Sequence, residues 1–153
     1  LTSRLAKIRH CVDQLSHDQV WWRPSESGNS IGHLLLHLAG NIRQWIIHGV
    51  GGAEDVRNRP QEFAPAGEID KDELLGGLQD TIDEADHVLA NVSADELLRP
   101  RRIQGFDVSG LSAIFDSVAH LHGHTQEIIC LTRMQLGNDY RFHWQPTTKE
   151  EGA

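Results

Sequence analysis

The sequence has few cysteines and no long apolar run, and these absences exclude several classes of protein. Its two cysteines, Cys11 and Cys130, lie far apart and form no Cys-x-x-Cys motif, so we expect neither a disulfide framework nor a thiolate metal site. A reduced, cytoplasmic setting fits this cysteine usage best. No apolar stretch approaches the roughly 20 residues of a transmembrane helix, so no membrane span is expected.

Positive charge is also scarce. The chain has 14 Lys and Arg against 22 Asp and Glu, which gives a net charge of -8 at pH 7. Duplex nucleic acid and anionic membranes are bound by basic surfaces, so neither is expected as the main partner. With 153 residues, the chain is long enough for one domain with a substantial core.

Apolar residues recur at helical spacing in four segments, near residues 1–15, 31–48, 71–92 and 111–136. Residues that commonly cap helix starts precede several of these segments or shorter turns, namely Ser16, Ser30, Asp70 and Ser93. No segment reads as a convincing strand, and residues 100–110 are interpreted as a connection. The sequence therefore predicts an all-α four-helix bundle over residues 1–144, followed by a flexible tail at 145–153. Because the chain begins at Leu1 rather than Met, residues can be missing upstream, including a targeting signal.

The second and third helical segments are joined by a Gly- and Pro-containing stretch from Val50 to Ile69. A connection of this length is long for a compact domain, and such segments usually serve as lids, binding loops or mobile links. It also permits the third helix to run parallel to the second.

Polar side chains form a row along the second helix. His33, His37, Asn41, Gln44 and His48 follow one another at spacings of four, four, three and four residues. The row is either the solvated side of a surface helix or a polar seam that lines a cavity between helices. His33 and His37 are also four residues apart, so the second helix could offer a metal-binding histidine pair of its own.

The fourth helix carries His120 and His124, which lie one turn apart on the same helix face. They belong to a seam with Ser117 and Ile128, beside an apolar stripe that begins with Leu111, Ile114, Phe115 and Val118. His122 falls on that stripe, so we expect it to be a packed histidine.

Two imidazoles do not complete a transition-metal site, and His37 is the candidate third ligand. Three neutral imidazoles suit zinc, nickel or another late divalent ion. Three protein ligands leave a coordination position open, as in catalytic zinc sites, where the ion can lower the pKa of a bound water to about 7. From spacing alone, a pair of histidines that binds nothing is the commoner outcome.

The Trp22-Arg23-Pro24 segment, the stretch from Asn29 to Asn41 and the His120-x-x-x-His124 helix together resemble the DinB/YfiT-like metal-binding superfamily, over about residues 1–140. The resemblance implies a four-helix bundle with a long second connection, usually dimeric, which is why a homodimer is expected. It also implies a divalent ion, zinc or nickel, held by His37, His120 and His124.

The sequence departs from the superfamily pattern at two places near the implied ligands. Gly40 stands where many members carry an aspartate, and Gln126-Glu127 stand where many carry Gly-Gln. Both positions alter groups that orient the ligands. Asn41 and Glu127 are candidate substitutes, and Glu127 is either a general base or a solvated helix carboxylate.

Three functions remain open at this stage. The first is a metal-dependent enzyme, either a transferase that uses a low-molecular-weight thiol as cosubstrate, as the resemblance implies, or a hydrolase acting on a small molecule. The second is a non-catalytic stress-response or binding module with a structural or adventitious ion. The third is a bundle whose histidines bind nothing. A basic cluster, Arg99, Arg101 and Arg102, either holds an anionic group or pairs with nearby carboxylates.

Overall fold

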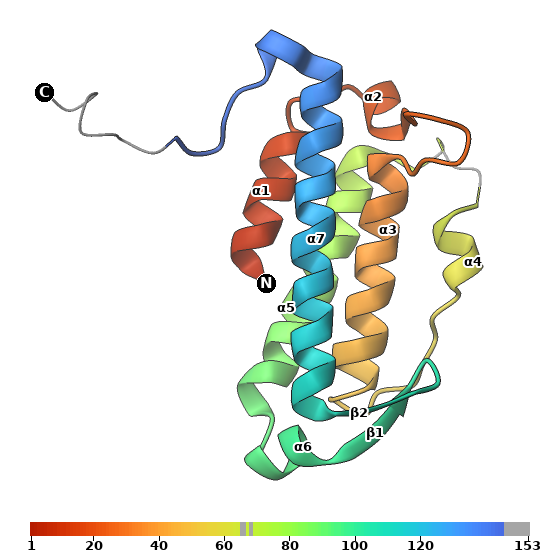
Figure 1. Cartoon of the computed structure of the whole chain (residues 1–153), viewed down its shortest axis with the longest axis vertical. Helices are drawn as coiled ribbons and strands as arrows, with labels where there is room; N and C mark the ends of the chain where they lie inside the picture. Colours follow the sequence, from red (N-terminus) through yellow and green to blue (C-terminus); the bar gives the residue numbers. More distant parts are fainter. Residues whose placement is uncertain (65–66, 68, 146–153) are drawn as a thin grey trace, which may run out of the picture.

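A computed structural model describes residues 1–64, 67 and 69–145. Its long helices form a bundle made of α1 (Thr2–Val12), α3 (Ile31–Ile42), α5 (Lys71–Asn91) and α7 (Gly110–Leu136) (Figure 1). α7 packs against α1 and α3, and α5 packs against the same two helices. The predicted all-α four-helix bundle is confirmed. The extent of the domain and the tail at 145–153 stay predictions, since all of that tail except Gln145 lies outside the described residues.

The long connection determines the directions of the helices. In Figure 1, α1 and α7 run one way along the bundle and α3 and α5 run the other way. The chain therefore returns along the length of α3 before α5 begins. The returning segment contains a single helical turn, α4 (Arg59–Glu62), and it packs against α3. The parallel course that the sequence permits for the second and third long helices is the one observed.

Polar caps begin most of the helices where the sequence predicts. The Oγ of Ser30 accepts a hydrogen bond from the backbone N–H of His33 at 3.1 Å, and Ser16 caps the short α2 (His17–Trp21) in the same way. Asp70 and Ser93 cap α5 and α6 (Ala94–Leu98). Each cap pairs a backbone donor that the first helical turn leaves without a partner.

Two short helices with other hydrogen-bond patterns extend the long ones. Beyond Ile42 the second long helix continues as a π-helical segment, η1 (Arg43–His48), before Gly49 ends it. A π-helical turn holds one more residue than an α-helical turn, and such turns are frequent at functional sites. α7 ends at Leu136, and the next residue, Gly137, has a φ of 53°, which favours glycine, and begins a 3-10 turn, η2 (Gly137–Asp139).

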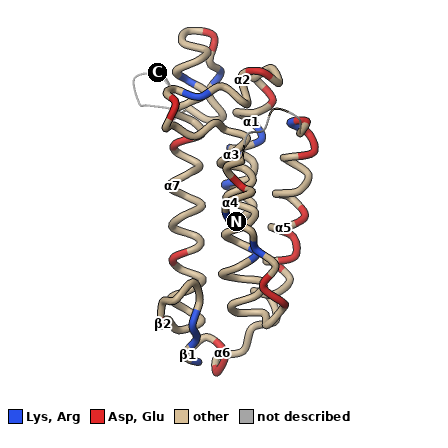
Figure 2. Tube along the Cα trace, turned by 90° about the vertical axis from the view of Figure 1, so that its right-hand side faces the viewer, with Lys and Arg blue, Asp and Glu red and all other residues tan. Residues whose placement is uncertain are grey.

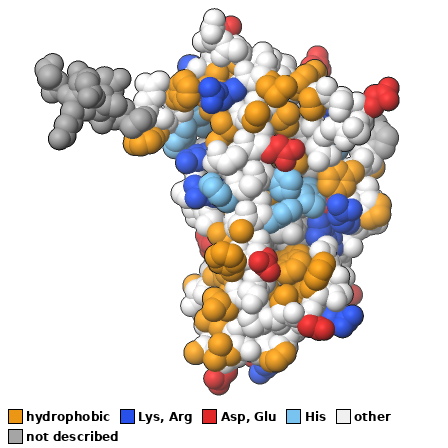
Figure 3. Space-filling view, in the orientation of Figure 1, with side chains coloured by type: hydrophobic (Ala, Val, Ile, Leu, Met, Phe, Trp, Pro, Cys, Tyr) orange, Lys and Arg blue, Asp and Glu red, His pale blue; other side chains and the backbone are white. Residues whose placement is uncertain are grey.

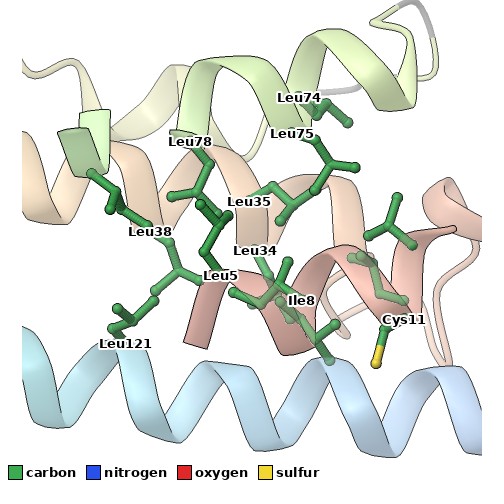
Figure 4. Close-up of a cluster of buried hydrophobic side chains, with 14 of the residues drawn as sticks. Leu5, Ile8, Cys11, Leu34, Leu35, Leu38, Leu74, Leu75, Leu78 and Leu121 are labelled. Carbon is green, nitrogen blue, oxygen red and sulfur yellow. The ribbon is translucent and has the colours of Figure 1, made fainter. Parts of the chain in front are cut away.

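The core is built mainly on α3, which contributes five fully enclosed apolar side chains. Ile31, Leu34, Leu35, Leu38 and Ile42 each have an exposed fraction of 0%. Figure 4 shows leucines of α3 and α5 beside Leu5 and Ile8 of α1 and Leu121 of α7. Burial of these side chains is the main stabilising contribution to the bundle, and it holds α3 and α7 side by side.

The prediction of no strands is wrong for residues 100–110. β1 (Pro100–Ile103) and β2 (Phe106–Ser109) form an antiparallel hairpin, with Ile103 opposite Phe106. The two loop residues, Gln104 and Gly105, have φ values of 52° and 84°, as in a type I′ turn. The signal was weak, because each strand has four residues and the loop lacks the usual Asn-Gly pair.

The helical spacing also predicts a buried apolar stripe on the fourth helix that runs from Leu111 to Leu121 and beyond, and this prediction is wrong for the first part of the stripe, although Leu121 itself is fully buried. Leu111, Phe115 and Val118 have exposed fractions of 55%, 70% and 39%, and His122 is exposed rather than packed. The face of α7 that meets its neighbours instead carries smaller side chains together with three larger apolar ones, namely Ala113, Ser117, Leu121, Thr125, Ile128 and Leu131. Leu111, Phe115 and Val118 therefore face solvent, and we call them the outward stripe of α7.

Charged residues are distributed along the chain, and acidic ones follow α5 (Figure 2). None of the helices in the described ranges combines the length and the apolar character needed to cross a membrane. The segment after α7 packs back on α1, where Nε2 of His10 lies 2.6 Å from the carbonyl oxygen of Arg141.

Candidate metal centre

Three histidines from two helices meet at the centre of the bundle's α3–α7 face. His37 lies on α3, and His120 and His124 lie one turn apart on α7. One ring nitrogen from each lies within 4.8 Å of the others, and Nε2 of His37 and Nε2 of His120 are 2.9 Å apart. The structure therefore brings together the three residues proposed from the sequence.

The donor set fits a divalent ion. Tetrahedral zinc with nitrogen ligands at about 2.0–2.1 Å separates those nitrogens by about 3.3 Å, so small movements of the rings would bring all three around one ion. Within residues 1–64, 67 and 69–145, no further His, Cys, Asp or Glu joins this cluster. Three ligands with no fourth protein donor are typical of sites that keep a coordination position open.

Carboxylates contact the Nδ1 atoms of two of the three imidazole rings. Nδ1 of His37 lies 2.8 Å from Oε2 of Glu62, and Nδ1 of His124 lies 2.7 Å from Oε2 of Glu127. A carboxylate accepts from a protonated Nδ1, which leaves the Nε2 lone pair free for an ion. Nη2 of Arg57 lies 3.3 Å from the same His37 nitrogen, but the shorter contact to Glu62 assigns the proton to Nδ1.

Arg57 in turn fixes Glu62. Its Nε donates to Oε1 of Glu62 at 2.6 Å and its Nη2 donates to Oε2 at 3.0 Å, a bidentate pair. Nη1 of Arg57 donates to Oε1 of Gln44 at 2.9 Å, and Nε2 of Gln44 donates to Asp55. Burial raises the pKa of Glu62, but hydrogen bonds from Arg57 and His37 outweigh it, so the net pKa lies below the usual value.

The polar row of the second long helix, which spans α3 and η1, is mostly buried. His33, His37, Asn41 and Gln44 are all buried, and His48 is half-buried. His33 contacts the carbonyl of Ala64, so it belongs to a separate set of contacts and does not join the cluster. The row is therefore not a solvated surface, and two of its members, His37 and Asn41, line a cavity between helices as the seam interpretation predicts.

Burial favours the neutral form of two imidazoles in the cluster, His120 and His37. It lowers the pKa of His120 to about 4, and the neighbouring His124, His37 and Arg57 add to the effect. Burial also lowers the pKa of His37, although Glu62 partly opposes the shift. Neutral imidazole is the form that binds a metal.

The depressed pKa of His120 predicts the acid sensitivity of the ion-free protein. In the unfolded chain His120 is protonated below the ordinary histidine pKa of 6.5. In the folded chain it stays neutral until the pH falls to about 4. The free energy of unfolding should therefore fall as pH drops from about 6.5 to about 4. Urea unfolding across this range, compared with His120→Gln, measures the effect. Equal acid sensitivity in the variant would contradict it.

A cavity of about 280 Å³ opens beside the cluster. His37, Asn41 and Trp45 line one side, and Ser117 and His120 line the other. The Oγ of Ser117 donates to Oδ1 of Asn41 at 3.0 Å, which links α7 to α3 at the wall of the cavity. Figure 3 shows histidine side chains at the surface in the middle of this face, next to basic side chains. The cluster is thus accessible to a small molecule.

Sequence comparison identifies the family. A family profile described as "Protein of unknown function (DUF1572)" matches residues 2–148. The chain belongs to the DUF1572 family. No curated protein matches this DUF1572 chain in sequence.

Solved structures show that the DUF1572 chain has a DinB-like fold. A DinB-like protein from Bacillus cereus ATCC 10987 superposes with a TM-score of 0.68 at 12% identity, over 88% of this chain and 87% of the other. The DinB-like protein YjoA from Bacillus subtilis gives a TM-score of 0.68 at 16% identity, over 94% of each chain. The DinB-like relationship predicted from the sequence is confirmed for the fold.

A larger cavity in the DUF1572 chain, about 560 Å³, lies away from the cluster, between α5, α6 and the start of the long connection. Arg99 and Arg101 line this cavity, but together with Arg102 they do not form a free basic cluster. Arg99 and Arg101 both pair with Glu96, and Arg102 pairs with Asp107. Charge pairing is therefore the correct interpretation of these arginines, and the histidine cluster is the better candidate site.

Sequence reasoning missed Arg57 and Glu62, which contact the cluster from the long connection. The one local signal is Pro60, since proline at the start of a short helix marks the turn that carries Glu62. Glu127 was singled out as a general base or a solvated carboxylate. It contacts His124 instead of standing free, and its role as a base stays a prediction.

Proposed function

We propose that this DUF1572 protein is a metal-dependent enzyme that binds one divalent ion, zinc or nickel, through His37, His120 and His124. The observation that carries the proposal is the cavity of about 280 Å³ lined by His37 and His120. A purely structural ion is normally enclosed by four protein ligands, whereas a catalytic ion keeps one position open to substrate. The similarity to DinB-like structures supports the arrangement of the helices that carry the three histidines, and it supports no particular reaction.

The chain's own residues would hold and tune such an ion. Glu62 and Glu127 would orient His37 and His124 with Nε2 toward the ion, and burial lowers the pKa of His37 and His120, which favours their neutral form. When bound, a divalent ion acts as a Lewis acid that favours the deprotonated form of a water or thiol ligand. A thiol-dependent transferase and a hydrolase are the two reaction classes that such a site serves.

Within this proposal, the substrate is a small molecule and a low-molecular-weight thiol is the cosubstrate of the transferase reaction. Glu127 has one carboxylate oxygen on His124 and a half-exposed side chain. Its contact with His124 supports an orienting role more directly than that of a general base.

We also propose that the protein forms a homodimer. The outward stripe of α7 supports this, because Leu111, Phe115 and Val118 expose apolar surface next to one another on one helix face.

Cobalt substitution tests the proposal. Titrating the metal-free protein with Co²⁺ should give one equivalent of tight binding and the visible absorption of a four-coordinate site. Adding a small thiol such as 2-mercaptoethanol should then produce a sulfur-to-cobalt charge-transfer band, because the open position accepts it. Thiol-transfer and ester-hydrolysis assays on the zinc- and nickel-loaded protein follow.

Two results would count against the enzyme. A cobalt spectrum that neither thiol nor azide changes would indicate a closed site and favour the non-catalytic module. Failure to bind Co²⁺, Zn²⁺ or Ni²⁺ at neutral pH would contradict metal binding altogether.

A further inference from the structure

The carboxylates that hold His37 and His124 come from different places in the chain. On α7, Glu127 reaches His124 from three residues further along the same helix. On α3, the position three residues after His37 is Gly40, which has no side chain to offer. The carboxylate on His37 comes instead from Glu62, 25 residues away in the long connection.

Gly40 leaves the space that Glu62 occupies. A Cβ atom built on Gly40 would overlap Oε1 of Glu62, would lie 2.9 Å from its Cδ and would come within 3.2 Å of Nε of Arg57. Contacts below 3.0 Å require something to move, and Glu62 is buried with both oxygens engaged. The glycine on α3 and the glutamate of α4 are therefore complementary.

The contact between Glu62 and His37 is held firmly. Only 3% of the Arg57 side chain and 8% of the Glu62 side chain are exposed. A buried ion pair is costly to leave half-formed, so Arg57 and Glu62 dock together. Arg57 also donates to Gln44 on η1, which anchors the connection to the second long helix at a second point.

We propose that Glu62 is a positioning residue of the metal centre, and that the long connection thereby completes the site on α3. Glu62 holds the His37 ring with Nε2 toward His120, and Arg57 fixes Glu62. The proposal rests on the proposed function, because it assigns Glu62 a role toward the ion. A carboxylate on the far nitrogen of a ligating histidine orients the ring and raises its basicity, and loss of such a partner typically lowers metal affinity 10- to 100-fold.

The test is a relocation of the carboxylate. Zn²⁺ affinity is measured by competition with a chromogenic chelator for the full chain, for Glu62→Ala, and for Gly40→Glu combined with Glu62→Ala. We expect Glu62→Ala to bind one equivalent about 10- to 100-fold more weakly. In the double variant, residue 40 takes the place relative to His37 that Glu127 has relative to His124, so the affinity should recover. Gly40→Glu alone should weaken binding, because Glu62 still fills the space.

Two further variants serve as controls. Glu54→Ala removes an exposed carboxylate from the same connection and should leave the affinity unchanged. If Glu62→Ala does not fold, Arg57→Met with Glu62→Met removes both buried charges, an exchange that is often neutral for stability. This variant should show the same loss of affinity, with a native circular dichroism spectrum.

Each outcome distinguishes this proposal from the proposed function. If the unmodified chain binds neither Zn²⁺ nor Ni²⁺ nor Co²⁺, the proposed function fails and this proposal fails with it. If the chain binds Zn²⁺ and Glu62→Ala binds it equally well, the positioning role alone is overturned. A loss that Gly40→Glu does not reverse would assign the effect to a loosened connection and would also overturn the positioning role.

Discussion

Replacing His124 with alanine is expected to lower the affinity for Zn²⁺ by more than about 100-fold. The variant keeps only His37 and His120 as donors, and two imidazoles do not make a zinc site. Loss of an outer partner alone typically costs 10- to 100-fold, so loss of a ligand should cost more. Elemental analysis of the purified, tag-free protein and chelator competition measure the effect.

The matched control is His122→Ala. His122 lies on the same helix, two residues from both His120 and His124, and is exposed. A helix rotates by about 100° per residue, so the His122 side chain points away from the cluster. Its removal should leave one equivalent of bound ion. A His124→Ala protein that retains full zinc content and affinity would contradict the three-histidine site.

Replacing Leu34 with alanine is expected to lower the free energy of unfolding by about 2–5 kcal/mol. Leu34 is fully buried and lies among the side chains of the main core cluster (Figure 4). The truncation removes apolar contacts and leaves a cavity that neighbours from several helices cannot fill without moving. Urea or thermal unfolding of the two proteins measures the difference.

Leu98→Ala provides the comparison for a surface leucine. Leu98 ends α6 with 72% of its surface exposed, so its truncation should change the free energy of unfolding by no more than about 0.5 kcal/mol. If Leu34→Ala were equally mild, α3 would not be the centre of the core.

Local sequence signals were sufficient for the bundle. Ser16, Ser30 and Ser93 were identified as helix starts because a cap acts within three residues of itself. The apolar stripe of α3 was likewise readable, because a buried helix face repeats with the helical period. Both signals depend on neighbours along the chain.

The same local signals could not show which apolar stripe faces a neighbour. Leu111, Phe115 and Val118 have the spacing of a buried face, yet they face solvent because α7 meets its neighbours through another face. The hairpin at residues 100–109 was missed for a related reason. Its pairing and the packing of Ile103 against Trp45 become visible only in three dimensions.

The candidate site was predictable in part. The spacing of His120 and His124 placed them on one helix face, and His37 was selected as a partner from its helix and from the DinB resemblance. Glu62 and Arg57 were not predictable, since their contacts with His37 depend on the path of a connection without periodicity. From the sequence, Gly40 is interpreted as the loss of a carboxylate. In the structure, the absence of a side chain at Gly40 leaves room for the carboxylate of Glu62.

The sequence separation of His37 and His120 has a consequence for synthesis on the ribosome. The two rings that meet at 2.9 Å are 83 residues apart, and α7 packs against both α1 and α3. The first three long helices therefore leave the ribosome before α7, which covers the apolar surface that they share. Until then that surface is open to association with other chains. An ion held between α3 and α7 would thus bind only after α7 has packed against the earlier helices.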